Sequence, residues 1–190
     1  MKNLFQISLT VFIITFLVCS FWANLIQGSH TSWTGSLMYL PHGCKVIFFC
    51  FFGYRSLPGL LLAELICHYL EFHNNGLAFF YLASFTSLIS IVAAAEILKW
   101  SKVSTGSNIH YFTRPNLANY KFILLVIVLS ALLSSIFTNV TLAAFNDVAI
   151  NVPVIVRFFI GDIIGALLFL FALILIFRML LIQKYFEIIK

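Results

Sequence analysis

Charge is scarce in this sequence. Lys, Arg, Asp and Glu together make up only 9% of the 190 residues, whereas hydrophobic residues make up 62% and the mean hydropathy is +1.07. A soluble domain keeps about a quarter of its residues charged, because charged side chains cover its water-facing surface. This composition excludes an ordinary soluble domain and indicates an integral membrane protein.

Motifs for catalysis and for cofactor or metal binding are also missing. The chain has no nucleophile elbow, phosphate loop, metalloprotease helix or cofactor fingerprint, and Ser134 and Ser135 have no His or Asp at a matching depth. The five histidines have no ligand spacing, and the four cysteines form no CxxC pair. We therefore expect no enzyme activity, no cofactor and no metal, with the cysteines as small packing residues. The net charge of +5 is spread thinly between apolar runs, so it does not indicate nucleic-acid binding.

Long apolar runs predict an all-α fold, a polytopic bundle of about six transmembrane helices in a single domain of residues 1–190. The predicted spans are residues 4–26, 36–54, 58–72, 77–98, 120–145 and 152–182. The first run is longer than a signal-peptide core and no A-x-A site closes it, so we interpret it as a retained helix. The second and third spans are short and joined by a tight turn. A re-entrant hairpin is the alternative for these two.

The basic residues predict the orientation of the bundle. With an even number of spans, both termini lie on one side of the membrane. Nine of the eleven Lys and Arg residues then lie on or near that side, and they are Lys2, Arg55, Lys99, Lys102, Arg114, Lys121, Arg178, Lys184 and Lys190. The opposite loops, residues 27–35, 73–76 and 146–151, contain neither Lys nor Arg. Since positive charge accumulates on the cytoplasmic side, both termini are predicted to be cytoplasmic.

The two remaining basic residues, Lys45 and Arg157, lie within spans, as does Asp162. Ionisable groups inside a bilayer usually face the bundle interior or a wet cavity. Lys45 and Asp162 have similar estimated depths, so we predict that they pair. Arg157 points to a different face of its helix, and its partner is a backbone carbonyl, His42, an anionic ligand or lipid headgroups. Two interpretations stay open: an outward-facing ligand site built from these residues, and a structural ion pair with Arg157 reaching outward to the headgroups.

Helix-breaking and close-packing residues accompany these charges. Pro41 and Gly43 precede the lysine of the second span, where they should break or kink the helix. Gly161 and Gly165 flank the aspartate of the sixth span in a GxxxG pattern, which permits close helix approach.

Polar residues near the predicted cytoplasmic side indicate an interfacial surface. Glu64 enters the third span from this side, and Glu96 close to Lys99 is typical of a solvated helix end. Residues 99–119 form the longest polar stretch and mix basic with aromatic residues. Such residues anchor a bundle to lipid headgroups, so we expect lipid contact here.

Two short patches resemble a known family. They are Pro41-x-Gly43 followed by Gly53-Tyr54-Arg55-x-x-Pro58-Gly59, and Arg157-Phe158-Phe159-Ile160-Gly161-Asp162-Ile163-Ile164-Gly165. In this order they resemble the membrane-associated sensor domain of bacterial signalling proteins, the MASE domain of the first type. That domain has a Pro/Gly-broken helix, a Gly-Arg turn, a Pro-started helix and, near its end, a Gly-Asp-x-x-Gly helix.

The resemblance implies a signalling role in the bacterial cytoplasmic (inner) membrane. Members of the family usually precede a histidine kinase, a diguanylate cyclase or a phosphodiesterase, and one group of sensor kinases reads its signal through a neighbouring transporter homologue. This chain has fewer spans and continues into no output domain, so we expect it to bind a small ligand from the external side, or a membrane partner, and to act through protein–protein contacts. Two alternatives stay open. One is the substrate-binding component of an energy-coupling-factor transporter, and the other is a structural subunit of a membrane assembly.

The predicted orientation is testable by cysteine accessibility. In a cysteine-free background, Ser32→Cys should react with an impermeant thiol reagent in intact cells, whereas Ser104→Cys should react only after the membrane is opened. Labelling of Ser104→Cys from outside would contradict the orientation.

Overall fold

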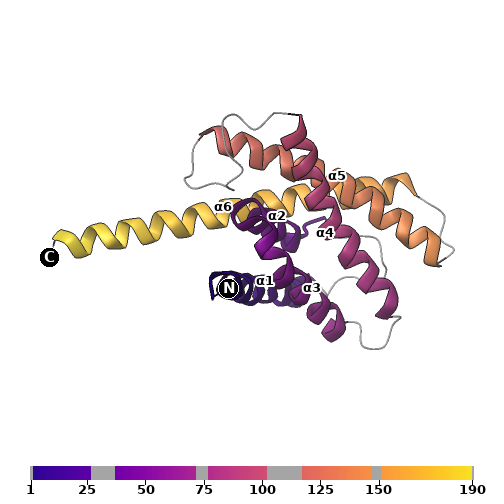
Figure 1. Ribbon diagram of the computed structural model, residues 1–190, viewed down its shortest axis with the longest axis horizontal. Helices are drawn as coiled ribbons and strands as arrows, with labels where there is room; N and C mark the ends of the chain where they lie inside the picture. Colours follow the sequence, from indigo (N-terminus) through magenta and orange to yellow (C-terminus); the bar gives the residue numbers. More distant parts are fainter. Residues whose placement is uncertain (1, 27–36, 72–76, 102–116, 147–150, 190) are drawn as a thin grey trace.

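The protein is a bundle of helices (Figure 1). The computed structural model describes residues 2–26, 37–71, 77–101, 117–146 and 151–189, and this part of the chain contains no strand. Its elements are α1 (Lys2–Ile26), α2 (Leu40–Phe52), the 3-10 helix η2 (Gly53–Ser56), α3 (Leu57–Glu71), α4 (Leu77–Trp100), α5 (Leu117–Asn146) and α6 (Val152–Ile189). The predicted all-α fold is confirmed, and the predicted runs coincide with these helices except at the start of α2 and the end of α6.

Within the described part of the chain, five helical segments are long and apolar enough to cross a membrane. They are Leu4–Asn24, Leu40–Leu70, Leu82–Trp100, Lys121–Thr141 and Val152–Met179, and the second of them includes α2, η2 and α3. Large apolar side chains such as Phe5 and Leu17 are exposed on the outer faces, whereas many polar and ionisable side chains are buried. This arrangement is the reverse of a soluble protein and suits a hydrocarbon surrounding, so the chain has the architecture of a multi-pass membrane protein.

α2 and α3 form a hairpin. In one straight helix, Lys45 and Glu64 would lie about 28 Å apart. Instead, Lys45 Nζ lies 2.7 Å from Glu64 Oε1, so the chain reverses between them. The reversal is η2, where Gly53 has a φ of 60°, a conformation that favours glycine, and Ser56 Oγ donates to the Gly53 carbonyl at 2.7 Å. Each arm is about 20 Å long, shorter than the roughly 30 Å hydrocarbon core of a bilayer.

α2 is the central helix of the bundle. It packs against α1, α4, α5 and α6, and every residue from Pro41 to Cys50 is buried. Val46 and Phe49 pack into a cluster with α4 and α5, while Ile47 packs into a second cluster with α1, α3 and α6. A polar side chain in this stretch must therefore find its partners inside the protein.

The beginning of α2 differs from the sequence prediction. The predicted kinked span over residues 36–54 is wrong in detail, because the helix begins only at Leu40. Pro41 lies in its first turn, where a missing N–H costs no intrahelical hydrogen bond. Gly43 lies inside the helix, and a Cβ at this position would collide with the backbone of Ala166 in α6. The Pro/Gly pair thus starts α2 and brings it against α6, and does not break it.

Gly161 and Gly165 provide the matching surface on α6. The Tyr39 N–H donates to the Gly161 carbonyl at 3.0 Å. A Cβ at Gly165 would collide with the Tyr39 carbonyl and with the Leu40 nitrogen. The close approach expected from the GxxxG pattern is confirmed, and its partner is the N-terminal end of α2.

α6 is longer than a membrane span requires. Its 38 residues extend about 57 Å, against roughly 30 Å of hydrocarbon. Figure 1 shows its C-terminal part projecting away from the other helices, and Phe171, Phe177 and Met179 on this part are exposed. The helix passes the predicted end at residue 182 because the sequence that follows contains neither Gly nor Pro.

The contact between α2 and α6 predicts the effect of one added methyl group. Gly165→Ala should lower the free energy of unfolding in detergent by about 1–3 kcal/mol, because the new Cβ meets backbone that cannot move aside easily. Val156→Ile adds one carbon to a half-exposed position of the same helix and should have little effect. Equal stability of Gly165→Ala and the parent protein would contradict the observed packing.

Candidate functional site

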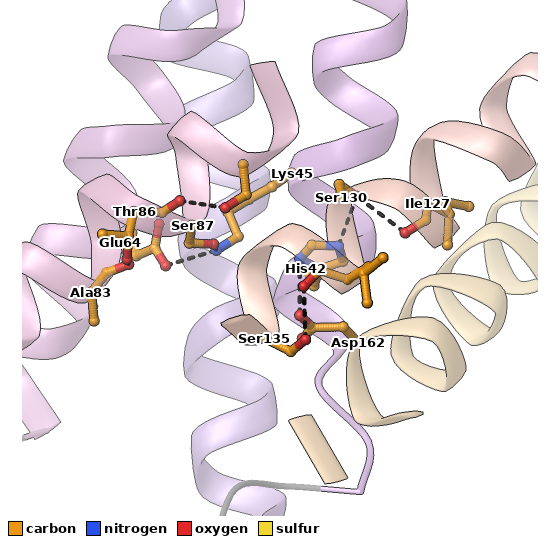
Figure 2. Close-up of polar contacts among 12 residues, drawn as sticks. His42, Lys45, Glu64, Ala83, Thr86, Ser87, Ile127, Ser130, Ser135 and Asp162 are labelled. Atoms are coloured by element: carbon orange, nitrogen blue, oxygen red, sulfur yellow. Dashed lines mark hydrogen bonds and ion pairs between the residues drawn. The ribbon is translucent and has the colours of Figure 1, made fainter. Parts of the chain in front are cut away.

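Two buried side chains on α2 organise the candidate site. His42 and Lys45 are three residues apart and therefore neighbours on the helix surface. His42 is 0% exposed and Lys45 is 1% exposed. Figure 2 shows them reaching into two adjoining groups of polar residues, one toward α3 and α4 and the other toward α5 and α6. We refer to these residues together as the α2 network.

The first group surrounds Lys45. Its Nζ donates to Glu64 Oε1 on α3 at 2.7 Å and to Ser87 Oγ on α4 at 2.6 Å. The same Nζ lies 5.5 Å from the centre of the Tyr39 ring, within the range of a cation–π interaction. An ion pair with additional hydrogen bonds offsets much of the cost of removing both charges from water. Lys45 thereby joins α2 to α3 and α4.

The second group surrounds His42. Its Nε2 lies 3.1 Å from Ser130 Oγ on α5, and its Nδ1 lies 3.5 Å from Asp162 Oδ2 on α6. Ser134, also on α5, is a hydrogen-bonding neighbour of the Asp162 carboxylate. His42 Nδ1 is buried and makes no well-formed hydrogen bond with the described residues. Lys45 acts electrostatically on both His42 and Asp162, so the two groups form one network.

The pairing of the charges differs from the sequence prediction. The predicted direct ion pair between Lys45 and Asp162 is wrong: Lys45 binds Glu64, and Asp162 faces His42. Arg157 is partly buried on α6, and its Nε has no hydrogen-bond partner among the described residues. The structure thus brings together three of the four predicted site residues and leaves Arg157 outside the network.

Glu64 is the main residue of the network that the sequence did not assign to the site. A signal for it exists, because Lys45 lies eight residues before Gly53 and Glu64 lies eight residues after Ser56. In a hairpin with its turn at residues 53–56, both side chains are equally far from the turn. This symmetry identifies the pair once the hairpin, and not two independent spans, is assumed.

Ser130, His42 and Asp162 follow the order of a Ser–His–Asp triad. The expectation that Ser134 has no Asp companion at its depth is wrong, because Ser134 is a hydrogen-bonding neighbour of Asp162. Hydrolysis also needs an accessible nucleophile and donors for the oxyanion. Ser130 is fully buried, and its hydroxyl lies within donating distance, 3.1 Å, of the Ile127 carbonyl. The backbone amides around it lie within a continuous helix, where they serve the helix itself. The arrangement is therefore a packed polar contact and not the geometry of a hydrolase.

A third polar contact lies between η2 and the C-terminal end of α4. Glu96 Oε1 accepts hydrogen bonds from Lys99 Nζ at 2.6 Å and from Tyr54 OH at 2.8 Å. The Glu96 side chain is 45% exposed, in agreement with the expected solvated helix end. This pair offers a control for the buried one. The polar stretch that follows, residues 102–116, lies outside the described residues, as do the predicted external loops apart from Asn146 and Asn151 at the ends of the last one.

No family model, curated protein or solved structure matches the chain. The resemblance to the membrane-associated sensor domain therefore stays a prediction that rests on the two short patches of α2, η2, α3 and α6.

The pairing of Lys45 with Glu64 predicts strong coupling between the two residues. Lys45→Met and Glu64→Gln should each lower the free energy of unfolding by about 3–5 kcal/mol, because each leaves an unpaired charge in the interior. The double variant should recover part of this loss, which a double-mutant cycle of unfolding in detergent measures.

The exposed pair is the matched control for this cycle. Lys99→Met, Glu96→Gln and their double variant remove the same chemical groups at an accessible helix end, where the cost should stay below about 1 kcal/mol. Additive losses for Lys45 and Glu64, without recovery in the double variant, would show that the pair does not form.

Proposed function

We propose that this protein is a sensor-like membrane module in which the α2 network sets the packing of the helices. A change in that network, caused by a ligand or by a partner, shifts the bundle between two packings, and a separate membrane protein reads the shift. In this proposal the chain spans the bacterial cytoplasmic membrane with both termini in the cytoplasm. The α2–α3 hairpin enters the membrane from the external side, either as two short crossings, which gives six spans, or as a re-entrant hairpin. It has no catalytic turnover of its own.

One observation carries the proposal. A short helix, buried along ten consecutive residues, places two ionisable side chains among α3, α4, α5 and α6. Polar groups in a membrane interior are costly to keep and mark functional elements more often than stabilising ones. Because one helix holds contacts to four others, any event that alters its charges affects the packing of the whole bundle. The resemblance to a sensor domain agrees with this interpretation.

A transport module is the second candidate. The same network favours it, since ionisable side chains inside a bundle also mark ion and substrate pathways. In that case the chain is the substrate-binding component of an energy-coupling-factor transporter. A structural subunit is the third interpretation, in which the network serves only to hold the helices.

Copurification separates these functions. The protein is extracted into lipid nanodiscs from its native membrane, and proteins and bound small molecules are identified by mass spectrometry. A histidine kinase, cyclase or phosphodiesterase whose association or activity changes in Asp162→Asn supports the sensor function. A paired ATPase module supports transport instead.

The control for this experiment is Glu96→Gln, which removes a carboxylate at the exposed helix end and should leave the partner unchanged. A stoichiometric complex that responds to neither substitution would contradict the sensor proposal and indicate a structural subunit.

A further inference from the structure

The charges in the α2 network do not balance if His42 is neutral. Lys45 carries one positive charge, whereas Glu64 and Asp162 together carry two negative charges. All of these side chains are buried, with at most 5% of any side chain exposed. An uncompensated charge in a membrane interior is strongly unfavourable. One further positive charge must therefore reside in or beside the network.

Arg157 does not supply this charge at the network. It lies five residues before Asp162 on α6, on a different face of the helix, and it makes no ion pair with Asp162. The remaining side chains of the network are uncharged hydroxyls: Ser130 beside His42, Ser134 beside Asp162 and Ser87 beside Lys45. From α1, Thr15 contacts Cys44 of α2. His68, on α3 four residues after Glu64, is a further titratable side chain, and it acts on Glu64 and Lys45 at the other side of the network. At the contact with the Asp162 carboxylate, His42 is the titratable neighbour.

The contact between His42 and Asp162 is where the charge is missing. His42 Nδ1 and Asp162 Oδ2 lie 3.5 Å apart, and Nδ1 is buried without a well-formed hydrogen bond. When Ser130 Oγ donates to the Ile127 carbonyl, it accepts from His42 Nε2–H. In that tautomer the bare Nδ1 of a neutral imidazole would face a carboxylate oxygen, and two lone pairs would meet.

We propose that His42 and Asp162 together form a proton-binding site. The pair holds one more proton than it would with a neutral imidazole and an ionised carboxylate. The proton resides on either group, as an imidazolium beside a carboxylate or as an imidazole beside a carboxylic acid. Both forms place a hydrogen between Nδ1 and Oδ2 and bring the network to zero net charge. The ligand of this site is thus a proton. The inference goes beyond the proposed function, because it holds for a sensor, a transporter or a structural subunit.

The proton links folding to pH with a definite sign. In the unfolded chain, histidine releases its proton above about pH 6.5 and aspartate is ionised above about pH 4. The folded protein keeps the extra proton above pH 6.5, so it binds one proton more than the unfolded chain there. Stability consequently falls as pH rises above 6.5, by up to tenfold in the folding equilibrium constant per pH unit. Between pH 4 and 6.5 both states hold one proton, and this contribution is flat.

Asp162→Asn reverses this dependence. The asparagine is neutral, so His42 needs no extra proton in the folded state, whereas the unfolded chain still takes one up below pH 6.5. Stability of this variant should therefore rise as pH increases toward 6.5 and should show no network-dependent fall above it. The measurement is the unfolding equilibrium in mixed detergent micelles from pH 5 to 9, with Glu96→Gln as a control that should follow the parent protein.

The outcomes distinguish a bound proton from a bound metal cation and from an empty site. A fall above pH 6.5 in the parent protein that is absent in Asp162→Asn supports the proposal. Identical pH profiles for the two proteins would overturn the proposal. It would also be overturned if added Na⁺ stabilised the parent protein at pH 9 but not Asp162→Asn, because a metal cation would then supply the charge. If Asp162→Asn does not fold, His42→Gln replaces it. That variant should lose stability with rising pH already from about pH 4, because its lone carboxyl must stay protonated when folded.

Discussion

Between Pro41 and Cys50, α2 has no face toward the surroundings, so every polar group on it must be satisfied by the helices around it. The helix nevertheless carries His42 and Lys45. Removing such groups from water or from the headgroup region costs several kcal/mol unless partners compensate. The rest of the bundle supplies those partners, one each from α3, α4, α5 and α6.

This constraint explains why elements distant in sequence lie together. Glu64 reaches Lys45 only because η2 reverses the chain, and the reversal relies on a glycine with positive φ. Asp162 reaches His42 because the glycines of α6 allow the start of α2 to approach its backbone. The packing glycines and the buried charges therefore serve one arrangement. A substitution in either set should disturb the other, since the charges pair only when the backbones are close.

The same constraint limits what the protein can do. A fully packed network with a buried serine has no room for the nucleophile and oxyanion geometry of hydrolysis. Under the proposed function, the network holds a charge in one of two arrangements, as the interior of a sensor or a coupled transporter would. The exposed apolar surface of the outer helices does not distinguish between these functions, because any membrane protein presents such a surface to lipid.

The sequence by itself determined the helices and their lipid-facing character, because 18 or more apolar residues in succession can satisfy their backbone in a bilayer only as helices. It also identified Lys45, His42 and Asp162 as interior residues, since isolated ionisable groups in apolar runs rarely face lipid. Only the tertiary structure decided which charges pair. Depth along a span, estimated from the sequence, placed Lys45 and Asp162 together, but the lateral order of the helices put Glu64 beside Lys45 and His42 beside Asp162. Hydropathy carries no information on that lateral order, because it depends on close contacts such as Gly43 with Ala166 and Gly165 with Tyr39, which arise between residues more than 100 positions apart.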